Sequence, residues 1–281
     1  MSLCFHKFPN VYHSISLSHF IKHLALTNPP SFSPRKTIRR ALTASTNHKS
    51  PLLETLTPRQ KEQISLYVDS LLEWNQKMNL TAVKDTNEVM SRHVEDSLAI
   101  ISPIRSLYTS DSDSLKLVDV GSGAGLPGLI FAIACPRWNV TLLESMNKRC
   151  LFLEHAVTVL GLDNVQVLRG RAETVGQSAE CREVFDVAVA RAVAEMRVLA
   201  EYCLPLVRVG GLFVAAKGHD PQEEVSNAEK AIKMLGASLL QLCPVDSRSP
   251  YGQRTAIVCL KDRPTPKKYP RDPGTPAKVP L

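Results

Sequence analysis

A glycine loop near residue 120 is the part of the sequence best suited to chemistry. Gly121, Gly123 and Gly125 alternate with small residues directly after the apolar run 117–120. Glycine lets the backbone turn sharply and approach a ligand without side-chain obstruction, and the helix expected next offers unpaired N–H groups. The pattern predicts a strand, a loop and a helix that form a nucleotide-cofactor pocket.

Glu144 is the second group of this predicted pocket. It ends the apolar run 139–144, about twenty residues beyond the loop, the separation that places a ribose-binding carboxylate beside the glycines of a βαβ unit. The alternatives are a glycine turn in an unrelated α/β protein and a solvated acid at a strand end. Because the glycine loop and Glu144 both fit the pattern of a βαβ unit that binds a nucleotide, they favour the cofactor pocket.

Further apolar runs predict the sheet that holds these groups. Three of them alternate with helix-length segments and lie at 165–168, 185–190 and 212–216. This alternation is typical of a mostly parallel sheet with helices on both faces. Two more runs, 237–242 and 253–260, are joined through residues 247–252, a connection too short for a crossover helix. The last pair is therefore predicted to be antiparallel, as in methyltransferases rather than dinucleotide dehydrogenases.

A helical segment precedes the predicted sheet. Thr57, Pro58 and Gln60 form a capping-box pattern with proline at the first helical position, so a helix should begin there. Apolar side chains then recur at helical spacing as far as Met78 and require a packing partner. A second helix is expected to carry residues 92–98. These helices form an extension of the catalytic domain.

Residues 1–50 have a composition unlike the rest of the chain. They hold seven Lys and Arg but no Asp or Glu, and the remaining 27 basic residues equal the 27 acidic ones in number, so the net charge of +7 resides in this segment. The segment is rich in Ser and Thr and lacks the apolar run of a secretory signal or membrane span. It is interpreted as a transit peptide, for a plastid in preference to a mitochondrion; the alternative is a disordered tail.

The seven cysteines are predicted to be reduced and structural. They show no CxxC pair and no metal-ligand spacing, so no metal site is expected. Cys135 and Cys243 are not expected to be nucleophiles, because neither follows the fourth predicted strand, where a catalytic loop would lie. His93 is interpreted as a structural histidine on a helix and is left out of the catalytic set.

Several separated motifs resemble the RsmG (GidB) family. They are WNxxxNLT at 74–81, RHxxDSL at 92–98, VDVGSGAGLPG at 118–128, KYPR at 268–271 and GTPAK at 274–278. The resemblance covers roughly residues 52–281. It implies a class I S-adenosylmethionine (SAM)-dependent methyltransferase with a Rossmann-like, seven-stranded sheet and an antiparallel last strand. It also implies methylation of N7 of a guanine in 16S-type small-subunit ribosomal RNA, here in an organelle.

The sequence predicts a plan of four segments, and the resemblance implies a set of cofactor contacts. Residues 1–50 would be the disordered transit peptide, 51–110 the helical extension, 111–262 the methyltransferase domain and 263–281 a basic tail. The implied SAM contacts are Gly121, Leu126, Ala172, Glu173 and Arg191, which join Gly123, Gly125 and Glu144 from the loop analysis.

Arg191 is the one catalytic residue expected, because N7 of guanine carries a free lone pair and no proton. The transfer then needs positioning rather than a general base. Arg191 would bind the methionine carboxylate of SAM or an RNA phosphate; the alternative is a surface salt bridge. The (Asn/Asp)-Pro-Pro-aromatic motif of amino-methyltransferases is absent after the fourth predicted strand, which favours a ring nitrogen as target.

The expected partner is small-subunit ribosomal RNA or an assembling small subunit, with no membrane contact and a monomeric enzyme. An RNA-binding patch is predicted near the ends of the strands and in the tail, at Arg169, Arg171, Lys217, Lys268 and Arg271. Two other functions remain open: a SAM methyltransferase for a small molecule or protein, and a non-catalytic SAM- or nucleotide-binding module.

Overall fold

The computed structural model describes residues 50–109, 114–191, 194–245 and 253–281. The predicted transit peptide, apart from Ser50, and the predicted connection at 247–252 lie outside the described residues.

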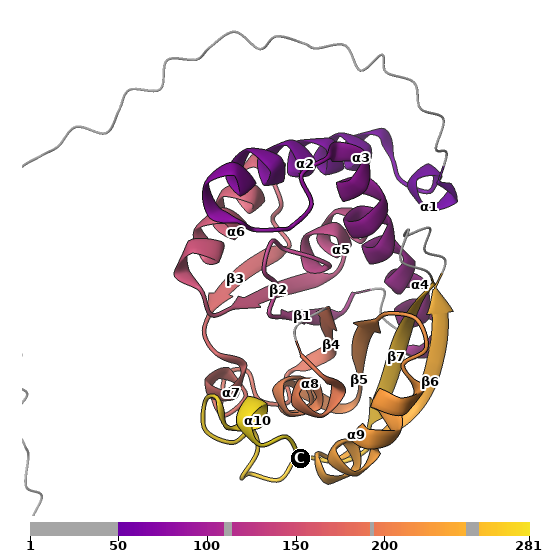
Figure 1. The fold of residues 1–281 in the computed structure, drawn as a ribbon, viewed down its shortest axis with the longest axis vertical. Helices are drawn as coiled ribbons and strands as arrows, with labels where there is room; N and C mark the ends of the chain where they lie inside the picture. Colours follow the sequence, from indigo (N-terminus) through magenta and orange to yellow (C-terminus); the bar gives the residue numbers. More distant parts are fainter. Residues whose placement is uncertain (1–49, 110–113, 192–193, 246–252) are drawn as a thin grey trace, which may run out of the picture. The chain divides into compact units, whose positions relative to one another are not determined.

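Seven strands form one sheet in the order β3-β2-β1-β4-β5-β7-β6 (Figure 1). The strands are β1 Lys116–Val120, β2 Asn139–Glu144, β3 Val165–Arg169, β4 Phe185–Arg191, β5 Val207–Lys217, β6 Ala237–Val245 and β7 Arg254–Lys261. β1 to β5 pair in parallel, and β7 runs antiparallel to both β5 and β6. The predicted parallel sheet with an antiparallel last strand is confirmed.

Two strands are longer than their apolar runs indicated. β5 begins at Val207, before Gly210 and Gly211, whereas the sequence predicted a start at 212. A Cβ at Gly211 would lie 2.5 Å from the carbonyl oxygen of Asp186, so glycine is needed where the two backbones approach. β6 continues through Pro244, which an edge strand tolerates because one side of its backbone has no ladder partner.

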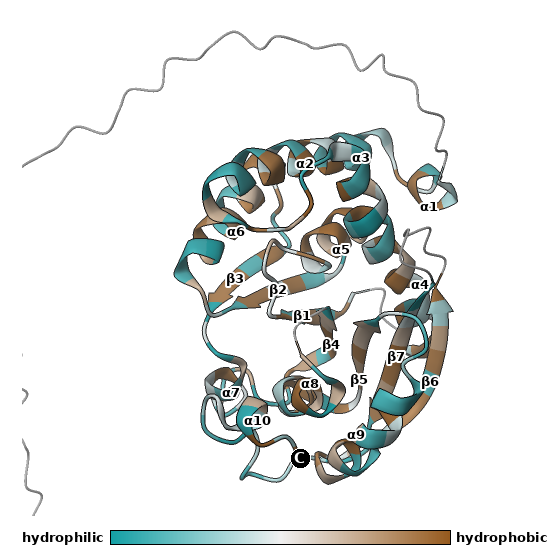
Figure 2. Ribbon diagram, viewed as in Figure 1, coloured by the Kyte–Doolittle hydropathy of each residue, from teal (hydrophilic) through white to brown (hydrophobic). Residues whose placement is uncertain are grey.

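Helices cover both faces of the sheet. They are α1 Pro51–Glu54, α2 Pro58–Met78, α3 Thr86–Val89, a π-helical turn Met90–Glu95, α4 Asp96–Leu107, α5 Gly128–Ala134, α6 Asn147–Leu160, α7 Ala172–Val175, α8 Met196–Cys203, a 3-10 turn Leu204–Leu206, α9 Gln222–Met234 and α10 Thr275–Lys278. α2, α4, α5 and α6 share one apolar core with one face of the sheet, and α8 and α9 pack on the other (Figures 1 and 2). Alternate residues of each strand enter the two cores, as the strand period of two requires.

The helical extension holds the glycine loop from outside. The capping box of Thr57 and Gln60 is present at the start of α2, as predicted. Gln60 also donates to the carbonyl of Ile133 in α5, at 2.8 Å. The hydroxyl of Tyr67, a fully buried residue, donates to the carbonyl of Ala124 in the loop, at 2.8 Å. The extension and the sheet therefore share one core, and α2 contributes to the position of the loop.

The C-terminal tail packs beside α7 and α8. Arg182 donates to the carbonyls of Thr265 and Tyr269, both at 2.8 Å. The backbone N–H of Gly274 donates to the buried carboxylate of Glu173 at the start of α7, at 2.8 Å. In the part of the chain that the structure describes, no helix has the length and apolar character of a membrane span.

Candidate active site

The glycine loop leads from the end of β1 to the start of α5. Gly121 and Gly123 have φ angles of 74° and 58°, in the left-handed region that favours glycine. A Cβ at Gly123 would meet only the carbonyl oxygen of Gly121, at 3.8 Å. A Cβ at Gly125 would lie 2.3 Å from the Leu129 side chain, inside the protein. Gly123 therefore leaves space for a ligand, whereas Gly125 allows the loop to pack on its own helix.

Glu144 lies beside this loop at the end of β2. Its carboxylate is 3% exposed and accepts hydrogen bonds from the N–H groups of Gly123, at 3.0 Å, and Met146, at 2.8 Å. The two bonds use different oxygens, and each oxygen has one further, longer contact, with the Ser145 hydroxyl at 3.5 Å and with the Arg149 guanidinium at 3.7 Å. The position suits the hydroxyl groups of a ribose, as the spacing from the loop predicted.

The glycine loop and the Glu144 carboxylate face a cavity of about 360 Å³, which we name the cofactor cavity. Its lining brings together five predicted residues, namely Gly121, Gly123, Leu126, Glu144 and Arg191, and adds Leu80, Thr81, His93, Ser122, Ala124, Ser145 and Arg149. The other three predicted cofactor residues, Gly125, Ala172 and Glu173, do not line it. The side chain of Glu173 is instead used to hold the C-terminal tail.

Arg191 is the last residue of β4 and a half-buried cation in the wall of the cofactor cavity. Its guanidinium makes long contacts of 3.4 Å with the carbonyl of His93 and the hydroxyl of Ser97. Within the described residues no carboxylate forms an ion pair with it. Burial lowers the pKa of Arg191, which expresses the cost of removing a cation from water. The residue is well placed to bind an anionic ligand group.

His93 is a cavity residue that the sequence interpretation left out of the site. It lies in the π-helical turn, where its Nε2 is 2.8 Å from the hydroxyl of Thr81 and its Nδ1 is 3.4 Å from the Arg191 guanidinium. Burial, and then the charge of Arg191, lower the pKa of His93 to about 4. The imidazole is therefore neutral at neutral pH. Thr81 and His93 belong to the motifs at 74–81 and 92–98, which are the sequence signal from which this contact could have been found.

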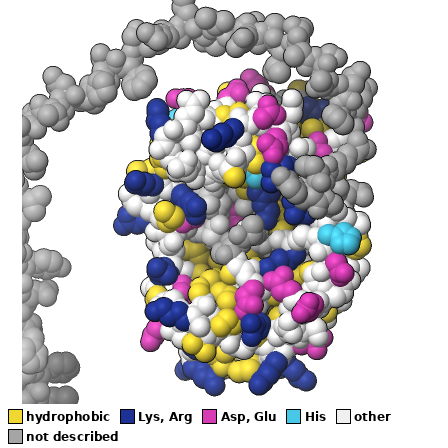
Figure 3. Space-filling view, viewed as in Figure 1, with side chains coloured by type: hydrophobic (Ala, Val, Ile, Leu, Met, Phe, Trp, Pro, Cys, Tyr) yellow, Lys and Arg dark blue, Asp and Glu magenta, His cyan; other side chains and the backbone are white. Residues whose placement is uncertain are grey.

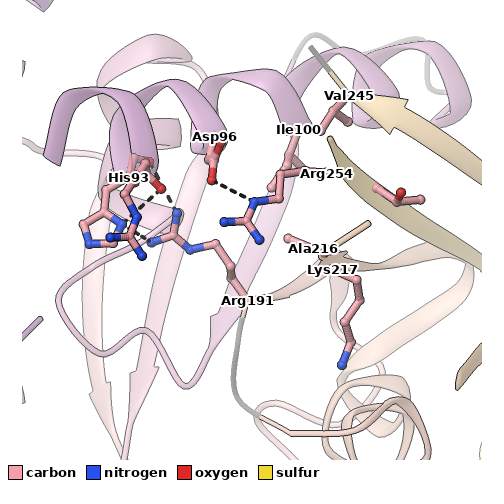
Figure 4. Close-up of a pocket in the computed structure, with 11 residues that line it drawn as sticks. His93, Asp96, Ile100, Arg191, Ala216, Lys217, Val245 and Arg254 are labelled. Carbon is pink, nitrogen blue, oxygen red and sulfur yellow. Dashed lines mark hydrogen bonds and ion pairs between the residues drawn. The ribbon is translucent and has the colours of Figure 1, made fainter. Parts of the chain in front are cut away.

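A second cavity of about 280 Å³ adjoins the first, and we name it the adjoining cavity. Arg191 and His93 line both. The remaining lining residues are Arg92, Asp96, Ile100, Ala216, Lys217, Gly218, Val245, Arg254 and Thr255. Figure 4 shows Asp96 on the helix above this space, with Arg254 extending toward it. Nε of Arg254 is 3.3 Å from the Asp96 carboxylate.

The structure separates the five predicted RNA-binding residues into two groups. Three make contacts within the protein: Arg169 with Asn147 at 2.6 Å, Lys217 with Glu224 at 2.6 Å, and Arg271 with the buried carboxylate of Glu201 at 2.6 Å. Arg171 and Lys268 are exposed, as Arg169 is too, and the Lys268 ammonium lies 5.1 Å from the centroid of the Tyr269 ring. Figure 3 shows Lys and Arg side chains spread over this face of the molecule rather than gathered in one patch.

The six cysteines that the structure describes do not contribute to either cavity. Cys135, buried at the end of α5, and Cys243, half-buried in β6, are free thiols away from both linings. Over residues 50–109, 114–191, 194–245 and 253–281, no three His, Cys, Asp or Glu side chains gather as a metal ion would need.

The strand order and the antiparallel β7 define the class I methyltransferase fold, because sheets that bind dinucleotides continue in parallel past the fifth strand. The chain matches the family model described as GidB, rRNA small subunit methyltransferase G, over residues 60–249. It belongs to this family.

Curated relatives and a solved structure give the extent of the likeness. The chain is 44% identical to "Ribosomal RNA small subunit methyltransferase G" of Lactobacillus johnsonii, over 80% of this chain and 93% of that protein. It is 42% identical to the protein of the same name from Bacillus cytotoxicus, over 81% of this chain and 93% of that protein. The 16S rRNA (adenine(1408)-N(1))-methyltransferase from Catenulisporales acidiphilia is 17% identical, with a TM-score of 0.44, over 58% of this chain and 92% of that one.

Proposed function

We propose that this enzyme methylates N7 of a specific guanine in the small-subunit ribosomal RNA of an organelle. The proposal is carried by Arg191, a half-buried cation that lines both cavities and forms no ion pair with a carboxylate among the described residues. When bound, SAM supplies an electrophilic methyl group on a sulfonium. The names of the bacterial relatives, which are methyltransferases of small-subunit ribosomal RNA, support the choice of substrate.

The cofactor cavity fits SAM at both ends. The Glu144 carboxylate is fixed by two backbone N–H groups and can accept hydrogen bonds from ribose hydroxyls. The Arg191 guanidinium can pair with the methionine carboxylate, which would compensate its burial. Gly123 leaves the loop backbone open to the ligand between these two groups.

The titration of His93 supports a ring nitrogen as the methyl acceptor. A neutral imidazole whose pKa is about 4 is a weak base at neutral pH, so it is a poor acceptor for the proton of an amine. N7 of guanine has a lone pair and loses no proton. The side chains around Arg191 then need only to hold the base in line and exclude water.

The organellar part of the proposal is supported by the composition of residues 1–50. A basic, hydroxyl-rich segment without acids suits import into a plastid, and a mitochondrion is the alternative. We further propose that the enzyme acts as a monomer in the stroma. Light scattering of the purified chain tests the oligomeric state.

The test of the function uses the full chain, SAM with a labelled methyl group and small-subunit ribosomal RNA. The RNA is digested to nucleosides and analysed by mass spectrometry, and 7-methylguanosine is expected. A transcript with 7-deazaguanine at the mapped target, which lacks the ring nitrogen, should stay unlabelled. Label on an exocyclic amine, or labelling of proteins or small molecules but not of RNA, would contradict the proposal.

A further inference from the structure

The adjoining cavity lies where a methyl acceptor has to meet the cofactor. It is bounded by α4, the carboxyl ends of β4 and β5, and β7, and it shares Arg191 and His93 with the cofactor cavity. Its volume of about 280 Å³ is below the range of roughly 300–1,000 Å³ that is usual for drug-sized ligands. The space suits a single flat base.

The charges around this cavity favour a nucleotide as its occupant. Four cationic side chains line it, and Asp96 is the one carboxylate among the described lining residues; the cations are Arg92, Arg191, Lys217 and Arg254. Three of these cations also form ion pairs, Arg92 with Glu88, Lys217 with Glu224 and Arg254 with Asp96. Arg191 forms no ion pair among the described residues, so it is the cation best placed to attract a phosphodiester backbone. A base can enter this recess when it is extruded from the RNA, as enzymes that act on bases in a stack require.

Asp96 gives the cavity a means to choose among bases. Its side chain is 7% exposed, and the ion pair with Arg254 restrains the carboxylate at the cavity wall. A carboxylate accepts hydrogen bonds and donates none. The Watson–Crick edge of guanine offers two adjacent donors, the N1–H and the N2 amino group, whereas adenine presents an acceptor at N1. The acceptor oxygens of Asp96 therefore match the donors of guanine and not the N1 acceptor of adenine.

We propose that the adjoining cavity binds the extruded target guanine, with Asp96 reading its Watson–Crick edge and N7 turned toward the cofactor cavity. This inference rests on the proposed function and assigns the base specificity of the same site. N7 lies on the opposite edge of guanine from N1 and N2. The base can thus be held by Asp96 while its reacting nitrogen faces the cofactor cavity.

The test combines an enzyme variant with a base analogue. Inosine keeps N7 and N1–H but lacks the N2 amino group. It replaces the mapped target guanine in a ligated small-subunit RNA, and single-turnover methylation is measured with SAM. The wild-type chain should methylate the inosine RNA about tenfold or more slowly, the usual effect of one lost hydrogen bond to a charged group. Asp96→Asn should methylate the guanine RNA about tenfold to a hundredfold more slowly than wild type.

The discriminating result is the combination of the two changes. Asp96→Asn should lose most of the preference for guanine over inosine, while its affinity for SAM, measured by calorimetry, stays unchanged. Asp69→Asn, which removes an exposed carboxylate on α2, is the matched control and should behave as wild type. A merely structural role for Asp96 would slow both RNAs equally and keep the preference for guanine.

Each outcome decides between the proposals. A full-rate Asp96→Asn enzyme, or a variant that keeps the wild-type preference for guanine, overturns the assignment of the adjoining cavity. Methylation of the 7-deazaguanine RNA would overturn the N7 function instead. A variant with altered SAM affinity would show that Asp96 belongs to the cofactor site, and it would also overturn the inference.

Discussion

Asp119 should make the stability of this protein fall as the pH rises toward neutrality. The residue lies in β1, just before the glycine loop, and is fully buried. One oxygen accepts the N–H of Gly128 at 2.9 Å, and the other has no hydrogen-bond partner among the described residues. Burial raises the pKa of Asp119 from its ordinary 3.8 to about 7, against the opposing effects of the Gly128 N–H and the charge of Arg191.

The direction of the pH dependence of stability is set by the state, folded or unfolded, that binds the Asp119 proton more tightly. Because the pKa of Asp119 is raised in the folded state, the native protein binds this proton more tightly than the unfolded chain does. The stabilisation is complete below about pH 4 and is lost as the pH rises through about 7. Between pH 5 and pH 8 the loss is about 2 to 3 kcal/mol, from the two pKa values and 1.36 kcal/mol per unit.

Asp119→Asn removes the ionisable group and keeps an acceptor for the Gly128 N–H. The free energy of unfolding is measured by urea titration at pH 5 and pH 8 without ligand, using the fluorescence of Trp74 and Trp138. Wild type should lose about 2 to 3 kcal/mol more than the variant between these pH values.

Asp186→Asn is the matched control for this experiment. Burial alone would raise the pKa of Asp186, but the N–H of Lys116, the Tyr108 hydroxyl and Arg208 hold it below its ordinary value. Asp186 is therefore ionised in the folded and in the unfolded state from pH 5 to pH 8. Its substitution should lower the free energy of unfolding by the same amount at pH 5 and at pH 8. If wild type and Asp119→Asn respond equally to pH, Asp119 is already ionised at pH 5 and the reasoning fails.

Three further predictions concern the cofactor, the reaction and the targeting segment. Gly123→Val should abolish SAM binding with the fold retained, because the side chain enters the cofactor cavity. Gly161→Val is the control: Gly161 has a similar positive φ but lies outside the site, so its substitution should leave the affinity for SAM unchanged. Calorimetry measures both affinities, and an unchanged affinity of the Gly123→Val variant would refute the pocket assignment. Arg191→Ala should lower the single-turnover rate of methylation by roughly tenfold to a thousandfold, and Arg191→Lys should restore part of the lost rate. The wild-type rate should stay constant over roughly pH 6 to 8.5. A full-rate Arg191→Ala enzyme, or a rising limb in that range, would count against the mechanism. A fusion of residues 1–50 to a fluorescent protein should enter plastids, as microscopy would show; a cytosolic signal refutes the targeting and a mitochondrial one corrects the compartment.

The sequence by itself determined the local elements of the site. Period-two apolar runs and turn residues specify β1, the glycine loop and β2, and the spacing between them brings Glu144 beside Gly123. The Thr57 capping box specified the start of α2 for the same reason: every group involved lies within a few residues. Signals of this kind need no knowledge of the rest of the fold.

Tertiary structure decided which residues line the same cavity and which charged side chains form ion pairs within the protein. His93 and Arg191 are 98 positions apart and meet because the π-helical turn packs over the end of β4. Gly123 and Gly125 are alike in the sequence, yet only the packing of α5 shows that the second accommodates Leu129 instead of a ligand. Arg271 resembles an RNA-binding residue until the fold places Glu201 beside it. These outcomes depend on long-range packing and burial, which set both the neighbours of a side chain and the cost of its charge.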